Sequence, residues 1–445
     1  MPGWVEHAIF WHVYPLGFVG ADVRPERPAP LAHRLGRLTG WLDYAIELGA
    51  SGLLLGPIFA AASHGYDTID HFRIDPRLGD DADFDALVEA ARKRGLKVVL
   101  DGVFNHVSRR HPAFRDVVAE GPSSPRASWF RLDWRPGRAA LDGPGAATFE
   151  GHPDLVVLNH DSPAVEALVT EVMVHWLDRG ASGWRLDAAY AVPLRFWARV
   201  LPRVRQRHPE AYLFGEMIHG DYVGFVKETG VDAVTQYELW KAIWSALNDR
   251  NFFELAWAFD RHNTFLDAFV PQTFVGNHDV TRFATRLKDP CSIDHALAIL
   301  FACGGTPSIY AGDEQALSGV KENRLGGDDA IRPAFPERPE AVSPAGLSVF
   351  RRHRELIGVR RRHAWLHRAR TRVLHLANET LAFEAFEGDH RLVVALNLGR
   401  ETELPAPGMR SVLIGRAAAL SAGGPKQKIR LGEAGWAILS PTAGP

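Results

Sequence analysis

Short apolar or β-branched runs alternate with longer amphipathic stretches along most of the chain. This alternation is typical of βα units, which build a parallel sheet or a barrel. The sequence predicts eight strands, at residues 8–14, 52–55, 97–103, 183–186, 211–215, 233–236, 273–276 and 307–310. Eight such units within 445 residues fit one α/β fold, a (β/α)8 barrel with room for an insertion and an appendage.

Two of the intervening helices have a clear apolar face. The stretch 81–94 has apolar side chains at i, i+3, i+4 and i+7, namely Phe84, Leu87, Val88 and Ala91. The stretch 162–179 begins with Ser162 as a predicted N-cap and Pro163 at the first helical position. Its predicted buried stripe consists of Val165, Leu168, Val169, Val172 and Trp176.

The alternation of strands and helices breaks in two places. Between His106 and about Leu158, Pro, Gly and Arg are abundant and no period is sustained, which predicts a long excursion after the third strand. After about Ala364 the pattern changes to alternating strands such as 380–386 and 391–397. This change predicts a small β-rich domain at the C-terminus.

Composition and charge exclude several classes of partner. The 51 Lys and Arg residues balance 53 Asp and Glu residues, so no electrostatic footprint for nucleic acid or a membrane surface is predicted. The first residues lack a basic and then apolar leader, and no apolar run reaches the roughly 20 residues that span a bilayer, which predicts a cytoplasmic location. Cys291 and Cys303 are predicted to be reduced and structural. The sequence predicts no oligomeric state.

Polar side chains interrupt the apolar ends of four predicted strands, in the segments 101–106, 183–187, 214–216 and 274–279. The catalytic groups of a barrel lie at the carboxyl ends of its strands. Asp187, Glu216 and Asp279 are therefore expected to converge from the fourth, fifth and seventh strands.

Three carboxylates at one strand end suit the cleavage of a glycoside. Retention of configuration needs one carboxylic acid for the leaving oxygen and one carboxylate about 5 to 5.5 Å away for attack on the anomeric carbon. Arg185 points to the same side as Asp187, and its charge is expected to keep this nucleophile ionised. Glu216 follows apolar residues, so desolvation is expected to raise its pKa, as a general acid and base requires.

Further polar groups at the strand ends have two possible roles each. Asp279 is predicted to orient the sugar ring and to stabilise oxocarbenium charge. His106 and His278 are predicted to donate hydrogen bonds to sugar hydroxyls, with satisfied core histidines as the alternative. Asp101 is expected either to orient Arg185 or to contact substrate.

The four strand-end motifs, in this order and spacing, resemble those of the α-amylase family, glycoside hydrolase family 13. Cyclomaltodextrinase-like, neopullulanase-like and α-glucosidase-like members are the most similar in pattern. Further matches lie at residues 65–67, 158–161, 305–314 and 326–336. The resemblance implies a (β/α)8 TIM barrel at 1–106 and 159–363, a short domain B at 107–158 and a C-terminal β-sandwich at 364–445.

The resemblance also implies a role for each matching residue. Asp187 is the nucleophile, Glu216 the acid/base and Asp279 the third carboxylate. The residues implied to bind substrate are Tyr66, which stacks beneath the sugar ring, the surrounding His106, Arg185 and His278, and the closing pair Asp67 and Arg282. A purely structural ion pair between Asp67 and Arg282 is equally open.

No metal or other cofactor is predicted. Asn105 matches a position that looks toward a calcium ion in classical α-amylases. The short domain B lacks an acidic cluster, whereas a hard cation such as calcium needs about six to eight oxygen ligands.

Residues next to the predicted carboxylates indicate the substrate. Ala188 and Ala189 after Asp187 are similar to members that act on α-1,4 bonds, whereas Met217 replaces a Trp usual in cyclomaltodextrinases. The sequence thus predicts retaining hydrolysis of α-1,4 bonds in maltooligosaccharides and α-glucans through a covalent glycosyl-enzyme intermediate. The alternative is a transglycosidase, or an α-glucosidase for a disaccharide such as maltose, trehalose or sucrose. A non-catalytic binding protein is disfavoured because all three carboxylates are present.

Overall fold

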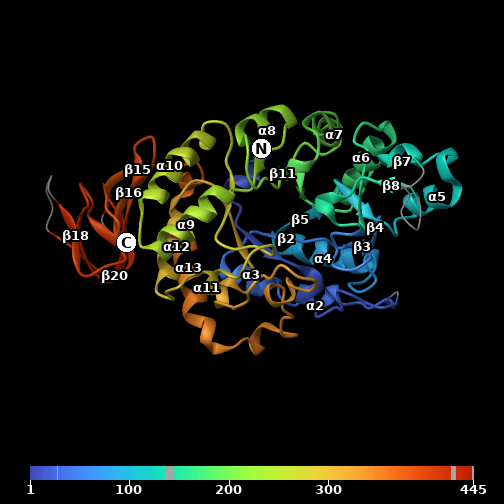
Figure 1. Cartoon of the computed structure of the whole chain (residues 1–445). Helices are drawn as coiled ribbons and strands as arrows, with labels where there is room; N and C mark the ends of the chain where they lie inside the picture. The colour runs from blue at the N-terminus through green and yellow to red at the C-terminus, as the bar shows by residue number, and fades with distance from the viewer. Residues whose placement is uncertain (28, 136–143, 422–426, 443–445) are drawn as a thin grey trace.

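The computed structural model describes residues 1–445 except 28, 136–143, 422–426 and 443–445. Parts of the predicted domains 107–158 and 364–445 therefore lie outside the described residues. Within the described part, the chain forms a central parallel sheet with surrounding helices and a separate antiparallel sheet at the C-terminal end (Figure 1).

Eight parallel strands form the central sheet, in the order β12-β11-β10-β5-β2-β1-β14-β13. They are β1 (Phe10–Val13), β2 (Gly52–Leu55), β5 (Lys97–Gly102), β10 (Gly183–Leu186), β11 (Tyr212–Gly215), β12 (Ala233–Val234), β13 (Gln272–Phe274) and β14 (Thr306–Tyr310). A parallel bridge between Thr235 and Gln272 joins the two edges, so the sheet closes into a barrel. Each strand predicted from the sequence overlaps one of these eight, which confirms the (β/α)8 fold.

Burial explains why the strands read as apolar runs in the sequence. Every residue of the eight strands is buried except Lys97, which is half-buried. A parallel sheet covered by helices on its outer face has this property. The few polar residues within the strands, such as Asp101 and Arg185, therefore stand out as candidates for function.

Helices connect consecutive strands and cover the barrel (Figure 1). The longer ones are α3 (Leu42–Leu48), α4 (Asp81–Lys93), α6 (Pro163–Asp178), α7 (Leu194–Arg207), α8 (Tyr222–Thr229), α9 (Tyr237–Asp249), α10 (Phe253–Leu266), α12 (Ser292–Ala302) and α13 (Leu347–Arg362). The short ones are α1 (Pro15–Phe18), α2 (Leu35–Thr39) and α11 (Phe283–Arg286). Among the described residues, no helix is long and apolar enough to cross a bilayer.

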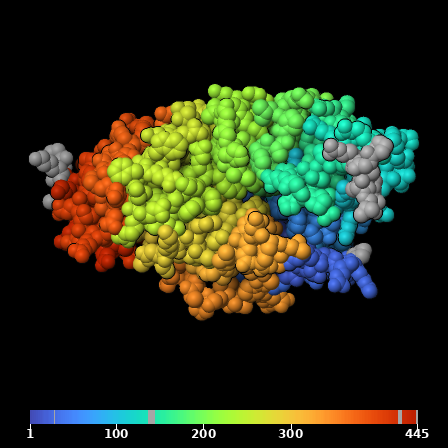
Figure 2. Space-filling model, viewed as in Figure 1, coloured from blue at the N-terminus to red at the C-terminus, as the bar shows by residue number. Residues whose placement is uncertain are grey.

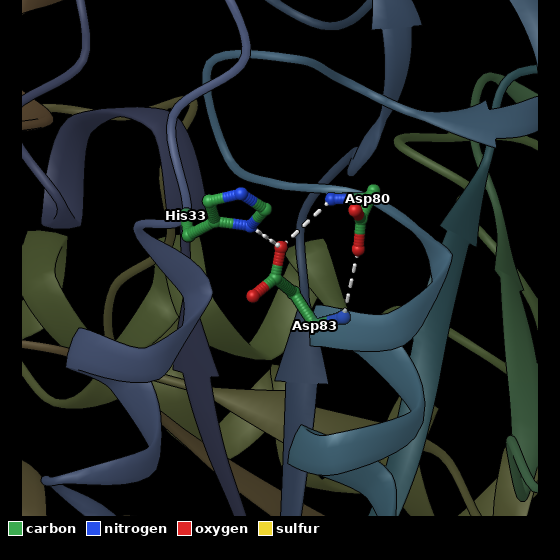
Figure 3. A group of neighbouring side chains, drawn as sticks. All are labelled: His33, Asp80 and Asp83. Atoms are coloured by element: carbon green, nitrogen blue, oxygen red, sulfur yellow. Dashed lines mark hydrogen bonds and ion pairs between the residues drawn. The ribbon is translucent and has the colours of Figure 1, made fainter.

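The start of α4 is fixed by a reciprocal cap. The Asp80 carboxylate accepts hydrogen bonds from the main-chain N–H groups of Ala82 and Asp83, and the Asp83 carboxylate accepts from the N–H of Asp80. His33 Nδ1 lies 2.6 Å from the same Asp83 oxygen (Figure 3). This capping box satisfies N–H groups that have no partner within the helix. The four predicted core residues of α4, Phe84, Leu87, Val88 and Ala91, are buried.

Helix α6 differs from its prediction at the cap. Pro163 occupies the first turn as predicted, but within the described residues the Ser162 side chain makes no cap hydrogen bond. The predicted stripe is buried at Val165, Val169, Val172 and Trp176, whereas Leu168 is half-buried. Apolar burial and the fixed φ of proline therefore define this helix without a side-chain cap.

The excursion after β5 is an ordered structure within its described part. Strands β6 (His106–Ser108) and β9 (Leu155–Val157) pair antiparallel at its base, and α5 (Pro112–Glu120) and the pair β7 (Leu132–Asp133) and β8 (Gly145–Ala146) lie between them. The sequence did not predict α5. An unpredicted hairpin of β3 (Phe59–Ala61) and β4 (Thr68–Ile74) follows β2.

The C-terminal sheet lies at the opposite end of the molecule from α5, β7 and β8 (Figure 1). Its antiparallel strands are β15 (Arg370–Leu376), β16 (Thr380–Glu387), β17 (His390–Asn397), β18 (Thr402–Pro405), β19 (Ser411–Leu420) and β20 (Lys428–Ser440). The long β20 pairs with β17, β18 and β19, and its side chains share a separate apolar core with β16 and β17. Phe259 of α10 packs on Phe383 of β16, and Figure 2 shows the two parts in contact.

The two cysteines have the states predicted from the sequence. Both Cys291 and Cys303 are free, and Cys303 is buried at the end of α12.

Candidate active site

The barrel brings three carboxylates together at the carboxyl ends of its strands. Asp187 and Glu216 directly follow β10 and β11, and Asp279 follows β13. The main-chain N–H of Asp187 donates to the carbonyl of Gly102, and that of Glu216 donates to the carbonyl of Leu186. Since these bonds continue the barrel ladder by one residue, the rigid sheet itself positions both side chains.

Arg185 contacts four carboxylates at this end of the barrel. Its Nη1 lies 2.7 Å from both oxygens of Asp101 and 3.1 Å from Oδ1 of Asp187. Its Nη2 lies 2.8 Å from Oε1 of Glu216 and 3.8 Å from Oδ2 of Asp279. Because guanidinium is a planar fork of fixed shape, one side chain sets the relative positions of these groups. Asp101 takes the orienting role expected for it.

The second oxygen of Glu216 is held by the main chain next to Asp187. The N–H of Ala188 donates to Oε2 of Glu216 over 2.9 Å. Ala188 has φ 44° and ψ 39°, in the left-handed region that residues with a Cβ rarely adopt. Backbone strain of this kind persists where the surrounding structure enforces it, commonly at functional sites. The turn after Asp187 thus aims a donor at Glu216.

A phenol and an amide complete the surroundings of Glu216. The hydroxyl of Tyr237 donates to Oε1 over 3.3 Å, and the side-chain amide of Asn277 donates to that hydroxyl over 2.8 Å. Both residues are buried. Sequence reasoning did not single out either residue, although Asn277 lies within the strand-end segment 274–279.

Burial dominates the electrostatics of the carboxylates. It raises the pKa of Asp187 well above the usual range, with Arg185 opposing and Glu216 and Asp101 adding to the rise. It also raises the pKa of Glu216, as predicted, and that of Asp101 to about 6. Arg185 lowers the pKa of Asp187, as expected, but burial and the three neighbouring carboxylates outweigh this one guanidinium. The cluster favours holding a proton, which a general acid needs.

The surroundings of Asp279 are cationic and aromatic. Arg332 Nη2 lies 3.0 Å from Oδ1 of Asp279, and Nε2 of His278 lies 3.1 Å from Oδ2. Arg332 also donates to the carbonyl of His278 and lies over the ring of Tyr14, 4.7 Å from its centroid. Burial lowers the pKa of His278 well below its usual range, so the imidazole is neutral.

Tyr66 links this group to the carboxylates. Its hydroxyl donates to Asp101 over 3.0 Å and contacts Nε2 of His278, and its ring stacks on His278 with centroids 5.4 Å apart. Its carbonyl lies 2.9 Å from Nε2 of His106. Burial lowers the pKa of His106 to about 4. The structure thus brings together the predicted residues Tyr66, His106, Arg185 and His278.

The predicted pair of Asp67 and Arg282 does not form. The Asp67 carboxylate accepts hydrogen bonds from the main-chain N–H and the hydroxyl of Ser63. Arg282 is 1% exposed and pairs with Asp313 at 3.2 Å while donating to the carbonyl of Ala311. A buried guanidinium takes the nearest buried acceptors, and these lie behind β14 rather than beside Asp67.

Arg332 is the cation that sequence reasoning missed. It lies in the segment 326–336 that resembles the family signature, so a signal for it was present in the sequence. Together with Tyr14 and Asp67 it borders a cavity of about 920 Å³, and the residues 321–329 form another wall of that cavity. The cavity therefore adjoins the Asp279 side of the carboxylate cluster.

One cluster in the described part of the chain has the residue types of a metal site. His33, Asp80 and Asp83 offer ligand atoms within 4.8 Å of one another (Figure 3). Three of its contacts already form the cap of α4 described above, which accounts for the arrangement without a metal.

Comparisons with known proteins agree with this site. The family profile described as "Alpha amylase, catalytic domain" matches residues 32–343. Cyclomaltodextrinase from Geobacillus thermopakistaniensis is 30% identical over 433 residues, which cover 91% of this chain and 71% of the relative. Neopullulanase 2 from Thermoactinomyces vulgaris is 31% identical over 430 residues, which cover 89% of this chain and 70% of the relative.

A solved structure shows the same architecture over nearly the whole chain. The cyclic α-maltosyl-(1→6)-maltose hydrolase from Arthrobacter globiformis superimposes with a TM-score of 0.84 and 28% identity, covering 99% of this chain and 100% of that chain. The barrel, its strand-end carboxylates and these matches show that the chain belongs to the α-amylase family of glycoside hydrolases and is a glycosidase.

Proposed function

We propose that the protein hydrolyses α-1,4-glucosidic bonds of maltooligosaccharides with retention of configuration. The observation that carries the proposal is the guanidinium of Arg185, which contacts both Asp187 and Glu216. A retaining glycosidase needs two carboxyl groups that flank one bond, one as nucleophile and one as acid. The N–H of Ala188 on the other Glu216 oxygen supports the same pairing.

The proposed reaction has two displacement steps. Glu216 gives its proton to the glycosidic oxygen while a carboxylate oxygen of Asp187 attacks the anomeric carbon, so that the leaving sugar departs and a glycosyl ester forms. Glu216 then takes a proton from a water molecule, whose oxygen attacks the same carbon and releases Asp187. Two inversions give net retention. Asp279 stabilises the positive charge that develops on the ring.

The proposed substrate class rests on the relatives and on the site. The similar proteins are named for cyclomaltodextrin, for pullulan and for cyclic α-maltosyl-(1→6)-maltose, all of which are built from α-linked glucose. The ring of Tyr14 is buried and that of Tyr66 is half-buried, and such aromatic surfaces suit a neutral sugar. Because Asp67 and Arg282 do not close the site, we propose that the cavity beside Arg332 accepts a further glucose unit.

We propose that activity needs no metal ion. The side-chain nitrogen of Asn105 lies 3.2 Å from Nδ1 of His106, and its main-chain carbonyl accepts a hydrogen bond from the N–H of Leu158. Among the described residues, the only group of His, Cys, Asp and Glu side chains with the spacing of a metal site is the one at the cap of α4. Treatment with EDTA should leave both the rate and the midpoint of thermal unfolding unchanged. A loss of either, restored by calcium, would contradict this proposal.

We also propose a cytoplasmic location, since a relative from Bacillus subtilis is named an intracellular maltogenic amylase.

The alternative is a transglycosidase or a disaccharide α-glucosidase that uses the same covalent intermediate. The specific observation in its favour is Met217, which replaces the Trp usual in cyclomaltodextrinases beside the acid. The two activities differ in the molecule that attacks the intermediate, a sugar hydroxyl or water.

A substrate panel tests the proposal. Maltose, maltotriose, cyclodextrin, isomaltose, trehalose and sucrose should be compared, with products identified and the first anomer released followed by NMR. We expect α-anomers and the highest kcat/KM on maltooligosaccharides or cyclodextrin. Early β-anomer would contradict retention. Oligosaccharides longer than the substrate would favour the transglycosidase, and turnover of trehalose or sucrose alone would favour the disaccharide enzyme.

A further inference from the structure

We propose that Glu150, from the excursion after β5, selects the sugar on the leaving-group side of the scissile bond, acting together with Tyr190. The proposal deepens the proposed function and rests on it, because it takes Glu216 as the general acid. It assigns to one residue of the excursion a part in recognising the leaving sugar.

The general acid identifies the side of the cleft. An acid that protonates the glycosidic oxygen must face the leaving sugar, so that sugar lies on the side of Glu216. Tyr190 belongs to the turn η5 (Ala189–Ala191), which begins two residues after Asp187. His219 comes three residues after Glu216, and its ring lies 6.3 Å from that of Tyr190. Tyr190 and His219 therefore lie on the two loops that carry the nucleophile and the acid.

Glu150 joins the excursion to this side of the barrel. It lies in the turn η4 (Phe149–Gly151), and its Oε1 accepts a hydrogen bond of 2.8 Å from the hydroxyl of Tyr190. The neighbouring Phe149 stacks on His106, with centroids 4.6 Å apart and an interplanar angle of 14°. Two adjacent residues of the excursion thus make these contacts: Phe149 packs on the base of the excursion itself, and Glu150 reaches the loop after β10.

The backbone at Glu150 is unusual for a residue with a side chain. Its φ of 48° and ψ of 29° lie in the left-handed region, where glycine and asparagine are favoured. A glutamate there is strained, and such strain is retained where its neighbours enforce it, commonly at ligand sites. The hydrogen bond from Tyr190 and the stacking of Phe149 are the contacts that hold this conformation.

The free oxygen of Glu150 has the chemistry to bind a sugar. Glu150 is exposed, and among the described residues its Oε2 has no hydrogen-bond partner. A carboxylate only accepts hydrogen bonds, and sugar hydroxyls donate them. Burial raises the pKa of Tyr190, with Glu150, Glu216 and Asp187 adding to the rise, so its phenol stays a donor. Together the two side chains offer an acceptor and a hydroxyl to the leaving sugar.

The test compares two substrates that share a maltosyl donor and differ only on the leaving-group side. Maltotriose places glucose there, whereas the fluoride of α-maltosyl fluoride is too small to contact Glu150. The measured quantity is kcat/KM for maltotriose divided by kcat/KM for α-maltosyl fluoride. In Glu150→Ala this ratio should fall about tenfold, the effect of one hydrogen bond to a charged group. In Glu150→Gln, which keeps an acceptor oxygen without the charge, the ratio should fall less.

Glu228→Ala is the matched control, because Glu228 is an exposed glutamate of α8 whose side chain makes no hydrogen bond or ion pair with the described residues. Its ratio should equal that of the wild type. An unchanged ratio in Glu150→Ala, or equal losses on both substrates, would overturn the proposal by reducing Glu150 to a structural residue. If the wild type failed to turn over α-maltosyl fluoride with retention, the proposed function itself would fall, and the two failures are thus distinct.

Discussion

The two sides of the carboxylate cluster hold their groups by different means. Asp279 is contacted by Arg332 and by the buried ring of His278, and a cavity of about 920 Å³ lies beyond Arg332. Glu216 is contacted by Arg185, by the main-chain N–H of Ala188 and by the hydroxyl of Tyr237. One side uses a second guanidinium, and the other uses two neutral donors.

This difference fits the roles proposed for the two sides. An arginine cannot be deprotonated in a protein, so Arg332 presents the same charge at every working pH, which suits holding a bound sugar in place. Neutral donors constrain Glu216 without supplying further positive charge, while burial raises its pKa. In the proposed mechanism, the Asp279 side therefore serves to position the sugar, and the Glu216 side carries a proton that moves twice in each cycle.

The largest expected effects separate nucleophile from acid. Asp187→Asn should lower kcat by about 10⁴-fold or more on both maltotriose and α-glucosyl fluoride, because either substrate needs the attacking carboxylate. Glu216→Gln should lower kcat/KM, which reports the first step, by about 10² to 10⁴-fold on maltotriose but far less on the fluoride, which leaves without a proton. Circular dichroism of both variants should match the wild type. Equal losses on the two substrates in Glu216→Gln would contradict the assignment of the acid.

Removing Arg185, the cation that the four carboxylates share, should lower the stability of the fold. Arg185→Met leaves the buried carboxylates without their common partner and should lower the free energy of unfolding by about 3 to 5 kcal/mol, as measured in urea. The pKa of Asp101 is about 6 and that of Glu216 is raised, so these groups stabilise the fold at low pH and lose that contribution as pH rises. The deficit of the variant should therefore be smallest in acid. A deficit independent of pH would contradict the charge argument.

Variants at Arg332 and Arg282 test whether the cavity on the Asp279 side of the site binds substrate. Arg332→Met should lower kcat/KM on maltotriose by about 10 to 100-fold, because a charged hydrogen bond to Asp279 is lost. Arg282→Met removes the partner of buried Asp313 and should instead lower the free energy of unfolding by about 3 to 5 kcal/mol. Kinetics and urea unfolding of both variants provide the measurements. If Arg282→Met raised KM strongly and left the free energy of unfolding nearly unchanged, Arg282 would have the closing role first predicted for it.

The same two arginines show how far sequence reasoning reaches. The eight strands follow from local periodicity, and the convergence of Asp187, Glu216 and Asp279 follows from their place at strand ends, because a barrel brings all such ends to one face. The partner of an arginine is not local. Arg282 and Arg332 both lie in loops near the site, and only the packing of Asp313 and Tyr14 decides which guanidinium reaches Asp279.

Other features depended on contacts between distant segments. The left-handed turn at Glu150 is held by Tyr190, 40 residues later, and no pattern around Glu150 predicts it. The rise in the pKa of Asp187 has the same origin. Arg185 lies two residues away and suggested a lowered pKa, whereas burial and carboxylates from three other strands decide the direction.

The smallest expected effect concerns the proton on Glu216. The hydroxyl of Tyr237 donates to the Glu216 carboxylate and so favours its ionised form, which lowers the pKa. Tyr237→Phe removes that donor, the pKa should rise, and the protonated acid should persist to higher pH. In the pH profile of kcat/KM, the basic limb should therefore move to higher pH. The value of kcat/KM at the pH optimum should change by less than about tenfold. Tyr44→Phe removes a phenol hydrogen-bonded to Glu314 instead, and should leave this limb in place. A shift of the basic limb to lower pH in Tyr237→Phe would mean that the phenol stabilises the protonated form of Glu216. The contrast between an Asp279 side that positions the sugar and a Glu216 side that carries the proton would then need revision.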